Sequence, residues 1–594
     1  MTHDTIPRRL RERARVDAQH PAYQVRQPDG SWSATTWAAY AAEVQAAAKS
    51  LLALGVEPGE GVCMLGYNRP EWVIVDVAAM TVGAMPAGIY TTCSPEEVAY
   101  IVGHCDARVV LVEDLGQLAK LQETKDQLPK LERVVLMKGV QSDDPLALAW
   151  EDFVSLGSSV PDADVDARLD ALQPDAVGTL IYTSGTTGPP KAVMLTHHNL
   201  THTADVAVDM VGATASDRMI SYLPLSHIAE QMFTVHGPIS SGLTIWYAES
   251  METLLRDLQA ARPTILFGVP RVWEKMHAGL TARMAQATGA KAVIATWATG
   301  IGRKAVDVRN AGGTPGGLLA LQYRLADRLV FSKVKAALGL DAARFGISGA
   351  APIAKEVLEF FAGLDIVIHE VYGQSEGTGP TTFNRPGQTK FGTVGPAIPG
   401  TEVRIADDGE ICLRGGNVFA GYLKEPAATA ETLIDGWLHS GDLGSIDADG
   451  FLSITGRKKE ILITAGGKNI APKNIEAALK NLPLVSQAVV IGDRRKFLSA
   501  LLTLDPEATQ AFAQEHGLPT DGIHARPELI AALQAGVDAE VNPRFARVEH
   551  VRKFSVLPRD LTIADGELTP TLKIKRRVVD QHFADVIEAM YAEG

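Results

Sequence analysis

A run of small and hydroxylated residues, YTSGTTGPPK, occupies residues 182–191. Two glycines, Gly185 and Gly188, let the backbone turn tightly and aim several N–H groups at one point. Hydroxyl groups and one cation complete the run: Thr183, Ser184, Thr186, Thr187 and Lys191. Together these groups predict a cradle for polyphosphate oxygens. The run is not a Walker A loop, because Pro190 and not glycine precedes the lysine. Taken alone, it is also compatible with a plain surface turn.

Such a loop needs a rigid frame, and apolar runs typical of buried strands alternate with helical stretches along most of the chain. Six runs are apolar on both faces, as parallel strands covered by helices are: residues 108–114, 133–139, 178–184, 263–270, 344–349 and 365–373. Small-residue loops follow several of them, and open α/β sheets bind ligands at the carboxyl ends of their strands. The segment 281–340, rich in alanine and leucine, is expected to be helical.

The pattern changes near residues 454–470, where short alternating strands give way to PKNIEAALKNL and a further strand, SQAVVIGD. Pro472 suits the first turn of a helix whose apolar residues share one face. We therefore expect an α/β fold with two domains. The large N-terminal domain, residues 1–456, contains mostly parallel sheets flanked by helices and a small β subdomain, and residues 457–594 form a small α+β domain.

Length, composition and charge narrow the class of protein. A chain of 594 residues is too long for one core, and 46% hydrophobic with 21% charged residues is ordinary for a globular protein. A net charge of −14 argues against a general nucleic-acid binder, although a local basic pocket can still bind a small anion. The four cysteines lack metal-ligand spacing and indicate free thiols in a reducing compartment.

The most apolar stretch, residues 72–90, contains Asp76 and Pro86, so we interpret it as a core helix running into a strand and not as a membrane span. The N-terminus has no apolar run behind its arginines and does not look like a signal peptide. A cytosolic protein without a transmembrane segment is expected, and attachment to a membrane surface stays open.

Six motifs in order resemble those of the adenylate-forming superfamily, which includes acyl-CoA synthetases, luciferases and peptide-synthetase adenylation domains. They are the run at 183–191, YLPLSHIAEQ (222–231), ISGAAPI (347–353), VYGQSEGTG (371–379), HSGDLGSID (439–447) and GRKKEILITAGGKNI (456–470). The segment NRPEWVIVD (68–76) and the helical insertion ending at residue 339 are similar to those of long-chain fatty acyl-CoA synthetases, with the bubblegum-type branch most alike.

The resemblance implies an enzyme that activates a fatty acid in two steps. The carboxylate attacks the α-phosphorus of ATP to give an acyl-adenylate and pyrophosphate, and the thiol of coenzyme A then displaces AMP. The implied substrates and cofactor are a fatty acid, ATP, coenzyme A and Mg²⁺, with a monomer or homodimer and no nucleic acid. Two alternatives remain open: a ligase that loads a carrier protein, and a catalytically inactive lipid- or nucleotide-binding homologue.

The resemblance also assigns roles to residues. Glu376 and Thr183 are the implied Mg²⁺ ligands, because a hard carboxylate suits this ion. Asp442 is expected to accept hydrogen bonds from the ribose hydroxyls, and Arg457 to assist at the ribose or a phosphate. The adenine site is expected to include Gly349, Ala350, Ala351, Tyr372, Gly373, Gln374 and Ser375, with Tyr372 stacked on the base. A turn aspartate, close strand packing and a core tyrosine are plainer interpretations of these residues.

His227 lies in a segment that gates the carboxylate or thiol path in relatives, although a buried structural histidine fits it nearly as well. Lys573 is the expected catalytic lysine, since a cation between carboxylate and α-phosphate offsets charge in the transition state. The family pattern Ser-Gly-Lys-Ile-x-Arg aligns with residues 571–576 and selects Lys573 over Lys575, although Leu572 replaces the glycine.

The C-terminal domain that carries Lys573 is implied to be mobile. It would turn about a hinge at Lys459 between the two steps, and bring Gly466 and Gly467 to line a channel for pantetheine. Glycines suit a narrow channel because they have no Cβ. A solvated lysine is the plainer interpretation of Lys459.

Overall fold

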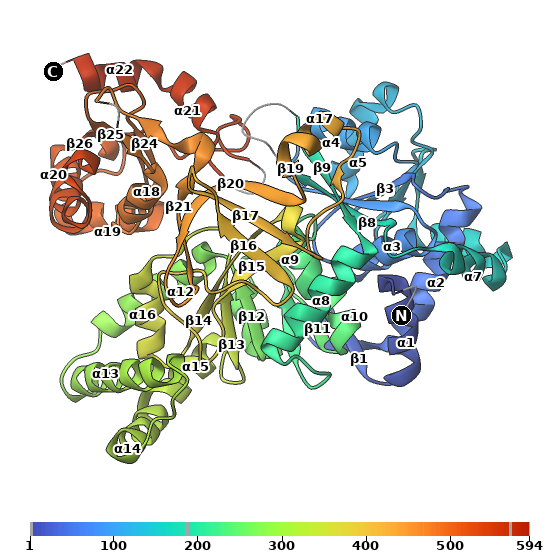
Figure 1. Ribbon diagram of the computed structural model, residues 1–594, viewed down its shortest axis with the longest axis horizontal. Coiled ribbons are helices and arrows are strands. Elements are labelled where there is room, and N and C mark those ends of the chain that lie inside the picture. Colours follow the sequence, from blue (N-terminus) through green and yellow to red (C-terminus); the bar gives the residue numbers. More distant parts are fainter. Residues whose placement is uncertain (1–3, 184–188, 467, 570–572, 593–594) are drawn as a thin grey trace.

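The computed structural model describes residues 4–183, 189–466, 468–569 and 573–592 (Figure 1). Its largest sheet has eight strands in the order β18-β9-β8-β4-β3-β5-β6-β7. The strands from β8 to β7 in this order run parallel, whereas β9 and β18 are antiparallel to their neighbours. Their bounds are β3 Gly61–Leu65, β4 Met85–Ile89, β5 Val109–Val112, β6 Arg133–Leu136, β7 Ala147–Leu148, β8 Val177–Thr183, β9 Lys191–Thr196 and β18 Gly421–Tyr422.

Two four-stranded sheets share the N-terminal domain with it, and each combines parallel pairs with one antiparallel pair. The first has the order β10-β11-β1-β2 and the second β12-β13-β14-β15. Their bounds are β1 Pro21–Arg26, β2 Trp32–Thr36, β10 Arg218–Ser221, β11 Thr244–Tyr247, β12 Ile265–Gly268, β13 Phe345–Ser348, β14 Ile368–Gln374 and β15 Gly379–Phe383. All six predicted strands are present in these sheets and in the eight-stranded one, so the α/β prediction is confirmed.

Helices cover the sheets, and their ends follow the local sequence. Helix α3, Pro70–Thr81, has proline in its first turn and is buried along its whole length. It runs into β4, as predicted for the most apolar stretch of the chain. Helix α8, His197–Val211, begins at a Thr196–Asn199 capping box and ends at Gly212 in the left-handed conformation. No helix among the described residues is long and apolar enough to span a lipid bilayer.

The predicted helical segment forms four consecutive elements around residues 281–340. They are α12 Pro270–Ala285, α13 Ala290–Asn310, α14 Gly317–Ala326 and α15 Ser332–Leu338, with a π-helical stretch, η4 Asp327–Phe331, before α15. Helices α13 and α14 extend away from the sheets in Figure 1. Helix α16, Lys355–Gly363, packs against α13.

A small antiparallel sheet connects the large domain to the last part of the chain. It contains β16 Thr401–Ile405, β17 Glu410–Gly415, β19 Leu433–Ile434, β20 Trp437–Ile446 and β21 Leu452–Arg457. Beyond it, the C-terminal part combines α18 Pro472–Lys480 with a three-stranded sheet of β24 Val485–Ile491, β25 Leu498–Leu504 and β26 Val551–Val556. This part has its own buried core, which fits the predicted α+β domain.

Candidate active site

The hydroxyl-rich run begins where β8 ends and finishes where β9 begins. Thr183 and Lys191 are paired across the two strands, and the Thr183 hydroxyl donates a 3.4 Å hydrogen bond to the Lys191 carbonyl oxygen. The residues between them that were predicted to bind phosphate, Ser184–Gly188, lie outside the described residues. The Lys191 ammonium lies 5.2 Å from the centre of the Tyr422 ring. The strand pair therefore holds one hydroxyl and one cation at the carboxyl end of β8.

Glu376 lies beside this strand pair, in a short 3-10 helix, η5 Ser375–Gly377, that follows β14. The Tyr422 hydroxyl donates a 2.8 Å hydrogen bond to Glu376 Oε1, and burial together with this carboxylate raises the pKa of Tyr422. The contacts from Lys191 to Tyr422 to Glu376 connect two motifs that are nearly 190 residues apart in the sequence. Tyr422 was missed by sequence reasoning, because a single tyrosine after a glycine carries no signal of its partners.

A second cluster joins three predicted residues around Asp442 on β20. The Tyr372 hydroxyl donates to Asp442 Oδ2 at 2.9 Å, and Arg457 Nε donates to Asp442 Oδ1 at 3.1 Å. Burial by itself lowers the pKa of Arg457, but the Asp442 and Glu460 carboxylates outweigh it and raise that pKa. Asp442 is thus a buried carboxylate held between a phenol and a guanidinium. Stacking of Tyr372 on adenine stays a prediction.

Of the small residues after β13 and along β14, the two glycines Gly349 and Gly373 are required by packing, whereas the two alanines are not. A Cβ on Gly349 would lie 2.6 Å from Val371 Cγ1, and one on Gly373 would lie 1.6 Å from the Gly379 carbonyl oxygen. Ala350 adopts a φ of 67°, and both Ala350 and Ala351 are exposed. Close strand packing therefore accounts for the two glycines. Contact of the exposed alanines with adenine stays a prediction.

His227 caps helix α9, Ile228–Gln231, and its Nδ1 accepts a 3.1 Å hydrogen bond from the Ala229 N–H. Since Nδ1 is an acceptor, the neutral ring carries its proton on Nε2. Burial and then the charge of Lys573 lower the pKa of His227 to about 4. The imidazole is therefore neutral at physiological pH and can offer one N–H donor to a ligand.

Lys573 lies in a hairpin near the C-terminus, where its backbone N–H donates to Thr569 Oγ1 at 3.0 Å. The neighbouring residues 570–572 lie outside the described residues. The Lys573 side chain is open to solvent, yet surrounding protein atoms and the cations Arg457 and Lys473 lower its pKa, while Asp442 and Glu376 act in the opposite direction. The Lys573 charge therefore interacts with one carboxylate of each cluster, Glu376 and Asp442.

Lys575 lies two residues further along the chain and has other neighbours. Its charge acts on the Cys93 thiol, and its backbone N–H donates to the Glu567 carbonyl oxygen at 2.8 Å. Lys573, and not Lys575, contributes to the lowered pKa of His227. The geometry therefore favours Lys573 as the lysine of the site, in line with the sequence alignment to the family pattern.

The predicted hinge lies directly after β21. Lys459 is exposed in the 3-10 helix η6, Lys458–Glu460, whereas Lys458 is anchored to Asp408 Oδ2 at 2.6 Å and to Glu410 Oε2 at 3.1 Å. Gly466 is also exposed, and a Cβ there would meet only Thr464 Oγ1 at 3.9 Å. Packing in this arrangement does not require a glycine at position 466. Gly467 lies outside the described residues.

The fold brings together three side chains of types that can bind a metal ion, although their spacing in the sequence did not indicate a metal site. Glu410, Cys412 and His439 bring their ligand atoms within 4.8 Å of one another. Glu410 already accepts hydrogen bonds from His439 Nδ1 at 3.0 Å, from the Gly441 N–H at 2.8 Å and from Lys458. The Lys458 ammonium supplies positive charge at Glu410, so in this arrangement the Glu410 carboxylate anchors η6.

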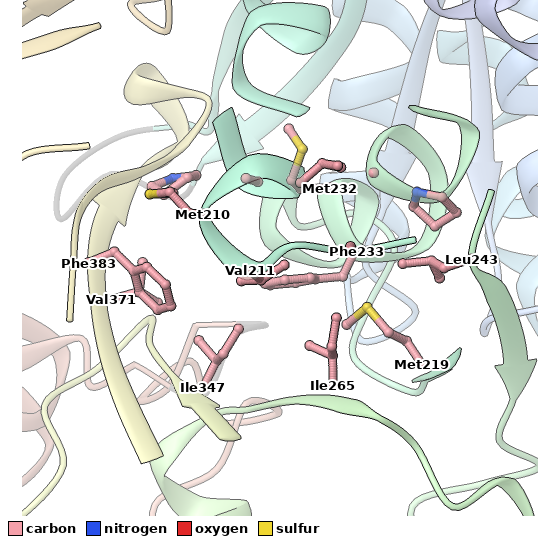
Figure 2. Close-up of a pocket in the computed structure, with 16 residues that line it drawn as sticks. Met210, Val211, Met219, Met232, Phe233, Leu243, Ile265, Ile347, Val371 and Phe383 are labelled. Atoms are coloured by element: carbon pink, nitrogen blue, oxygen red, sulfur yellow. The ribbon is translucent and has the colours of Figure 1, made fainter. Parts of the chain in front are cut away.

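An apolar cavity lies behind residues 222–231, the predicted gate segment that contains His227. It lies between α8, the π-helix η3 Met232–His236, and strands β12, β13 and β14 (Figure 2). Figure 2 shows side chains from all these elements pointing into one space; its walls include Met210, Met219, Met232, Phe233, Leu243, Ile265, Ile347, Val371 and Phe383. Its volume is about 60 Å³, enough for only a few water molecules. A long alkyl chain can enter only if flexible walls such as Met210 and Met232 move.

A buried carboxyl group, Glu230, fixes the gate segment next to this cavity. Its Oε1 accepts hydrogen bonds from Ser221 Oγ at 2.7 Å, Thr234 Oγ1 at 2.8 Å and Asn68 Nδ2 at 3.2 Å. Burial raises the pKa of Glu230 to about 7. The network ties the segment 68–76 to the gate, and it was missed because its members are up to 162 residues apart.

Comparisons of the chain with family models and with curated proteins indicate the same family. A model described as AMP-binding enzyme matches residues 10–423, and one described as AMP-binding enzyme C-terminal domain matches residues 459–594. A long-chain-fatty-acid–CoA ligase of Mycobacterium bovis is 40% identical over 99% of this chain and 97% of its own length. The long-chain-fatty-acid–CoA ligase ACSBG2 of Xenopus laevis is 38% identical over 99% of this chain and 84% of its own length.

Among solved structures, the O-succinylbenzoate coenzyme A synthetase of Bacillus subtilis, in complex with ATP and a magnesium ion, is similar with a TM-score of 0.67. The match is 21% identical and covers 96% of this chain and 98% of that one. This likeness shows a shared fold across both parts of the chain.

Proposed function

The chain belongs to the AMP-binding enzyme family, and on that basis we propose that it activates a long-chain fatty acid with ATP and transfers the acyl group to coenzyme A. Pyrophosphate leaves in the first step and AMP in the second. The observation that carries this proposal is that the charge of Lys573 interacts with the Glu376 and Asp442 carboxylates, while Glu376 is bonded to Tyr422 beside the strand pair that holds Thr183 and Lys191. The names of the full-length relatives support the choice of acid and thiol.

The first step brings a carboxylate and a triphosphate together, so the site must offset repulsion between anions. We assign Lys191 and the run 183–191 to the phosphates, and Lys573 to the space between the carboxylate and the α-phosphate, where negative charge builds up. Asp442 would accept hydrogen bonds from the ribose hydroxyls. Arg457, already bonded to Asp442, would hold that carboxylate in place and add positive charge near the phosphates.

The donor set at Glu376 fits a magnesium ion. One carboxylate oxygen is bonded to Tyr422, and among the described residues no donor approaches the other oxygen within hydrogen-bond distance. A hard oxygen ligand beside a phosphate-binding strand pair is what Mg²⁺ prefers. We propose Glu376 and the Thr183 hydroxyl as its protein ligands; when bound, the ion neutralises phosphate charge. Tyr422 orients Glu376 for this role.

The apolar cavity would receive the alkyl chain, with the carboxylate near His227 and Lys573. Val371, in the cavity wall, directly precedes Tyr372, so the chain would lie behind the nucleotide strand. The neutral His227 can donate its Nε2–H to the carboxylate without adding charge. Cavity walls of methionine and phenylalanine suit an alkyl chain and offer no partner to a polar acid.

For the second step we propose that the chain divides at residues 456/457 and that the C-terminal domain turns about Lys459. This motion withdraws Lys573 and brings Gly466 and Gly467 toward the adenylate, where the absence of a Cβ leaves room for pantetheine. The exposed Gly466, which no packing contact requires, supports this assignment. Four buried free cysteines suit a reducing compartment, so we also propose a cytosolic enzyme.

The test is release of AMP. Protein incubated with ATP, Mg²⁺ and palmitate should release AMP and pyrophosphate when coenzyme A is added, and a panel of acids from medium to very long chains gives the preferred length. A phosphopantetheinylated carrier protein in place of coenzyme A tests the carrier-loading alternative. Absence of AMP release with every acid and both acceptors would reject the proposed activity and favour an inactive binding homologue.

A further inference from the structure

The helical hairpin of α13 and α14 carries an unusual number of exposed apolar side chains. Val293 and Leu318 are each 69% exposed and Leu321 is 65% exposed, which are the highest values among the exposed large hydrophobic residues described. Leu325 and Leu329 continue the series at 51% and 38%. Spacings of three and four residues put these leucines on one face of α14 and η4. This face is called the leucine face below, defined by Leu318, Leu321, Leu325 and Leu329.

The hairpin holds the leucine face outward because its opposite face is packed. Ala326 and Phe331 pack with Ala298 and Ile301 of α13 in a small separate core. A Cβ on Gly302 would lie 2.3 Å from the Gly363 carbonyl oxygen, so α13 lies directly on the end of α16.

Charged contacts also fix the hairpin to the body of the protein. Arg309 and Lys335 form ion pairs with the buried Asp365, and the Tyr323 hydroxyl donates to the same carboxylate at 2.8 Å. These contacts join the end of α13, the middle of α14 and α15 to one point. The leucine face therefore cannot fold back onto the protein without breaking a buried ionic cluster.

The charge of this region is opposite to that of the chain. Residues 281–340 contain nine Lys or Arg residues and two Asp residues, a net charge of +7, whereas the whole chain has −14. Arg324 and Arg328 lie beside Leu325 on the helix and are exposed, and no acidic side chain in the described part of the chain forms an ion pair with either. Apolar and unpaired cationic side chains thus share one surface of the hairpin.

We propose that the leucine face and its flanking arginines dock on an anionic lipid surface. Leucines on one helical face with neighbouring cations match an interfacial helix, which lies in the plane of the headgroups and does not cross the membrane. Anionic headgroups attract each nearby cation, and the apolar side chains enter the acyl boundary. A protein partner would not require excess positive charge beside the leucines. The rest of the chain has a negative net charge, and this charge keeps its surfaces away from an anionic lipid surface.

Vesicle flotation with the full chain tests this proposal without turnover, so the result is independent of the proposed activity. Vesicles of phosphatidylcholine alone are compared with vesicles that contain about 30% phosphatidylglycerol, at low and high salt. We expect the wild-type protein to float with the anionic vesicles at low salt, and less at high salt. The triple variant Leu318→Ser, Leu321→Ser, Leu325→Ser should lower the bound fraction about tenfold or more, and Arg324→Glu with Arg328→Glu should abolish the preference for anionic vesicles.

Matched controls change other exposed residues outside the hairpin. The triple variant Leu115→Ser, Met251→Ser, Leu255→Ser removes exposed apolar side chains, and Arg494→Glu with Arg547→Glu makes the same change in net charge; both should float like the wild type. Unchanged melting temperatures and far-UV circular dichroism show that each variant is folded. The proposal is overturned if the wild type does not float, if the leucine variant floats as well as its control, or if size-exclusion chromatography shows a dimer that only the leucine variant disrupts.

Discussion

At the scale of single residues, Lys573 is the group whose surroundings most resemble a catalytic cation. Its charge lies close to Glu376, Asp442 and His227, although the residue is carried by the far end of the chain. A lysine held near two carboxylates and open to solvent can reach a bound carboxylate and phosphate together. A solvated basic tail is the plainer interpretation of Lys573, and the interactions of its charge with Glu376, Asp442 and His227 favour a role in the site.

We expect Lys573→Ala to slow formation of the acyl-adenylate by about 10²–10³-fold, the usual cost of removing one preorganised electrostatic group. Pyrophosphate exchange measures this step. Thioester formation from supplied acyl-adenylate should stay within a few-fold of wild type, since Lys573 has no role there. Lys575→Ala is the matched control, and an equal loss in that variant would contradict the assignment of Lys573.

The pH dependence of the first step should follow the depressed pKa of Lys573. Surrounding protein atoms and the cations Arg457 and Lys473 lower this pKa, so the lysine loses its charge at a lower pH than an ordinary lysine. We therefore expect adenylation to decline on the alkaline side. Lys473→Gln removes one cation, raises the pKa of Lys573 and should shift this decline to higher pH. Lys480→Gln removes the same charge from the other end of α18 and should leave the profile unchanged. Identical shifts in both variants would count against the explanation.

Tyr422 gives a prediction for the magnesium site. Tyr422→Phe removes the hydrogen bond to Glu376 but keeps the ring beneath Lys191. Loss of one hydrogen bond to a charged group costs about 1.5–3 kcal/mol, so the Mg²⁺ concentration for half-maximal adenylation should rise about tenfold or more, with little change in melting temperature. Tyr100→Phe, outside the site, is the control. A Mg²⁺ titration that is the same for both variants would exclude an orienting role for Tyr422.

At the scale of elements, the cavity between α8, η3 and strands β12–β14 should set the length of the acyl chain. Val371 lies on β14 directly before Tyr372, whereas Leu243 lies on the opposite side of the cavity in Figure 2. Leu243→Trp should therefore shorten the preferred acid. Since one methylene in an apolar pocket is worth about 1–3 kcal/mol, we expect kcat/KM for palmitate to fall at least about tenfold relative to octanoate.

The control for this change is Leu51→Phe, which also overpacks the same hydrophobic core but does not line the cavity. Both variants should lose about 1–3 kcal/mol of stability, measured by denaturant unfolding. Only Leu243→Trp should alter the ratio of activities with long and short acids. A ratio that stays at the wild-type value would place the alkyl chain elsewhere.

The elements were largely predictable because each depends on local sequence. Buried parallel strands are apolar on both faces, so residues 108–114 and 344–349 were identified without knowledge of their neighbours, and Pro472 marked the start of α18. The contacts of the site were less accessible. Tyr422 and Glu230 have partners that are distant in sequence, and no periodicity records such contacts. The motif order predicted which segments belong to the site, and only the fold showed that Gly349 and Gly373 are required by strand packing.

At the scale of the whole molecule, we propose that the two domains are held in an arrangement suited to the first step. The charge of Lys573 interacts with Asp442 and Glu376 of the large domain. Arg544 pairs with Glu356 of α16 at 2.7 Å, but both side chains are largely exposed, so this ion pair adds little stability. Lys458 is anchored to Asp408 and Glu410, whereas the adjacent Lys459 is free in solvent. Rotation after residue 458 would therefore leave the anchored strand β21 in place.

Lys459→Pro tests this rotation, because proline fixes φ near −65°, a value compatible with the 3-10 turn that Lys459 occupies here. The variant can keep the arrangement that presents Lys573, so pyrophosphate exchange should stay within about threefold of wild type. Transfer of the acyl group from supplied adenylate to coenzyme A should fall about tenfold or more, because the C-terminal domain cannot turn. Lys459→Ala removes the side chain without fixing φ and should leave both steps near wild type. Equal slowing of both steps by proline, or loss of transfer in the alanine variant, would show that the side chain or the local fold matters and that rotation at this residue does not.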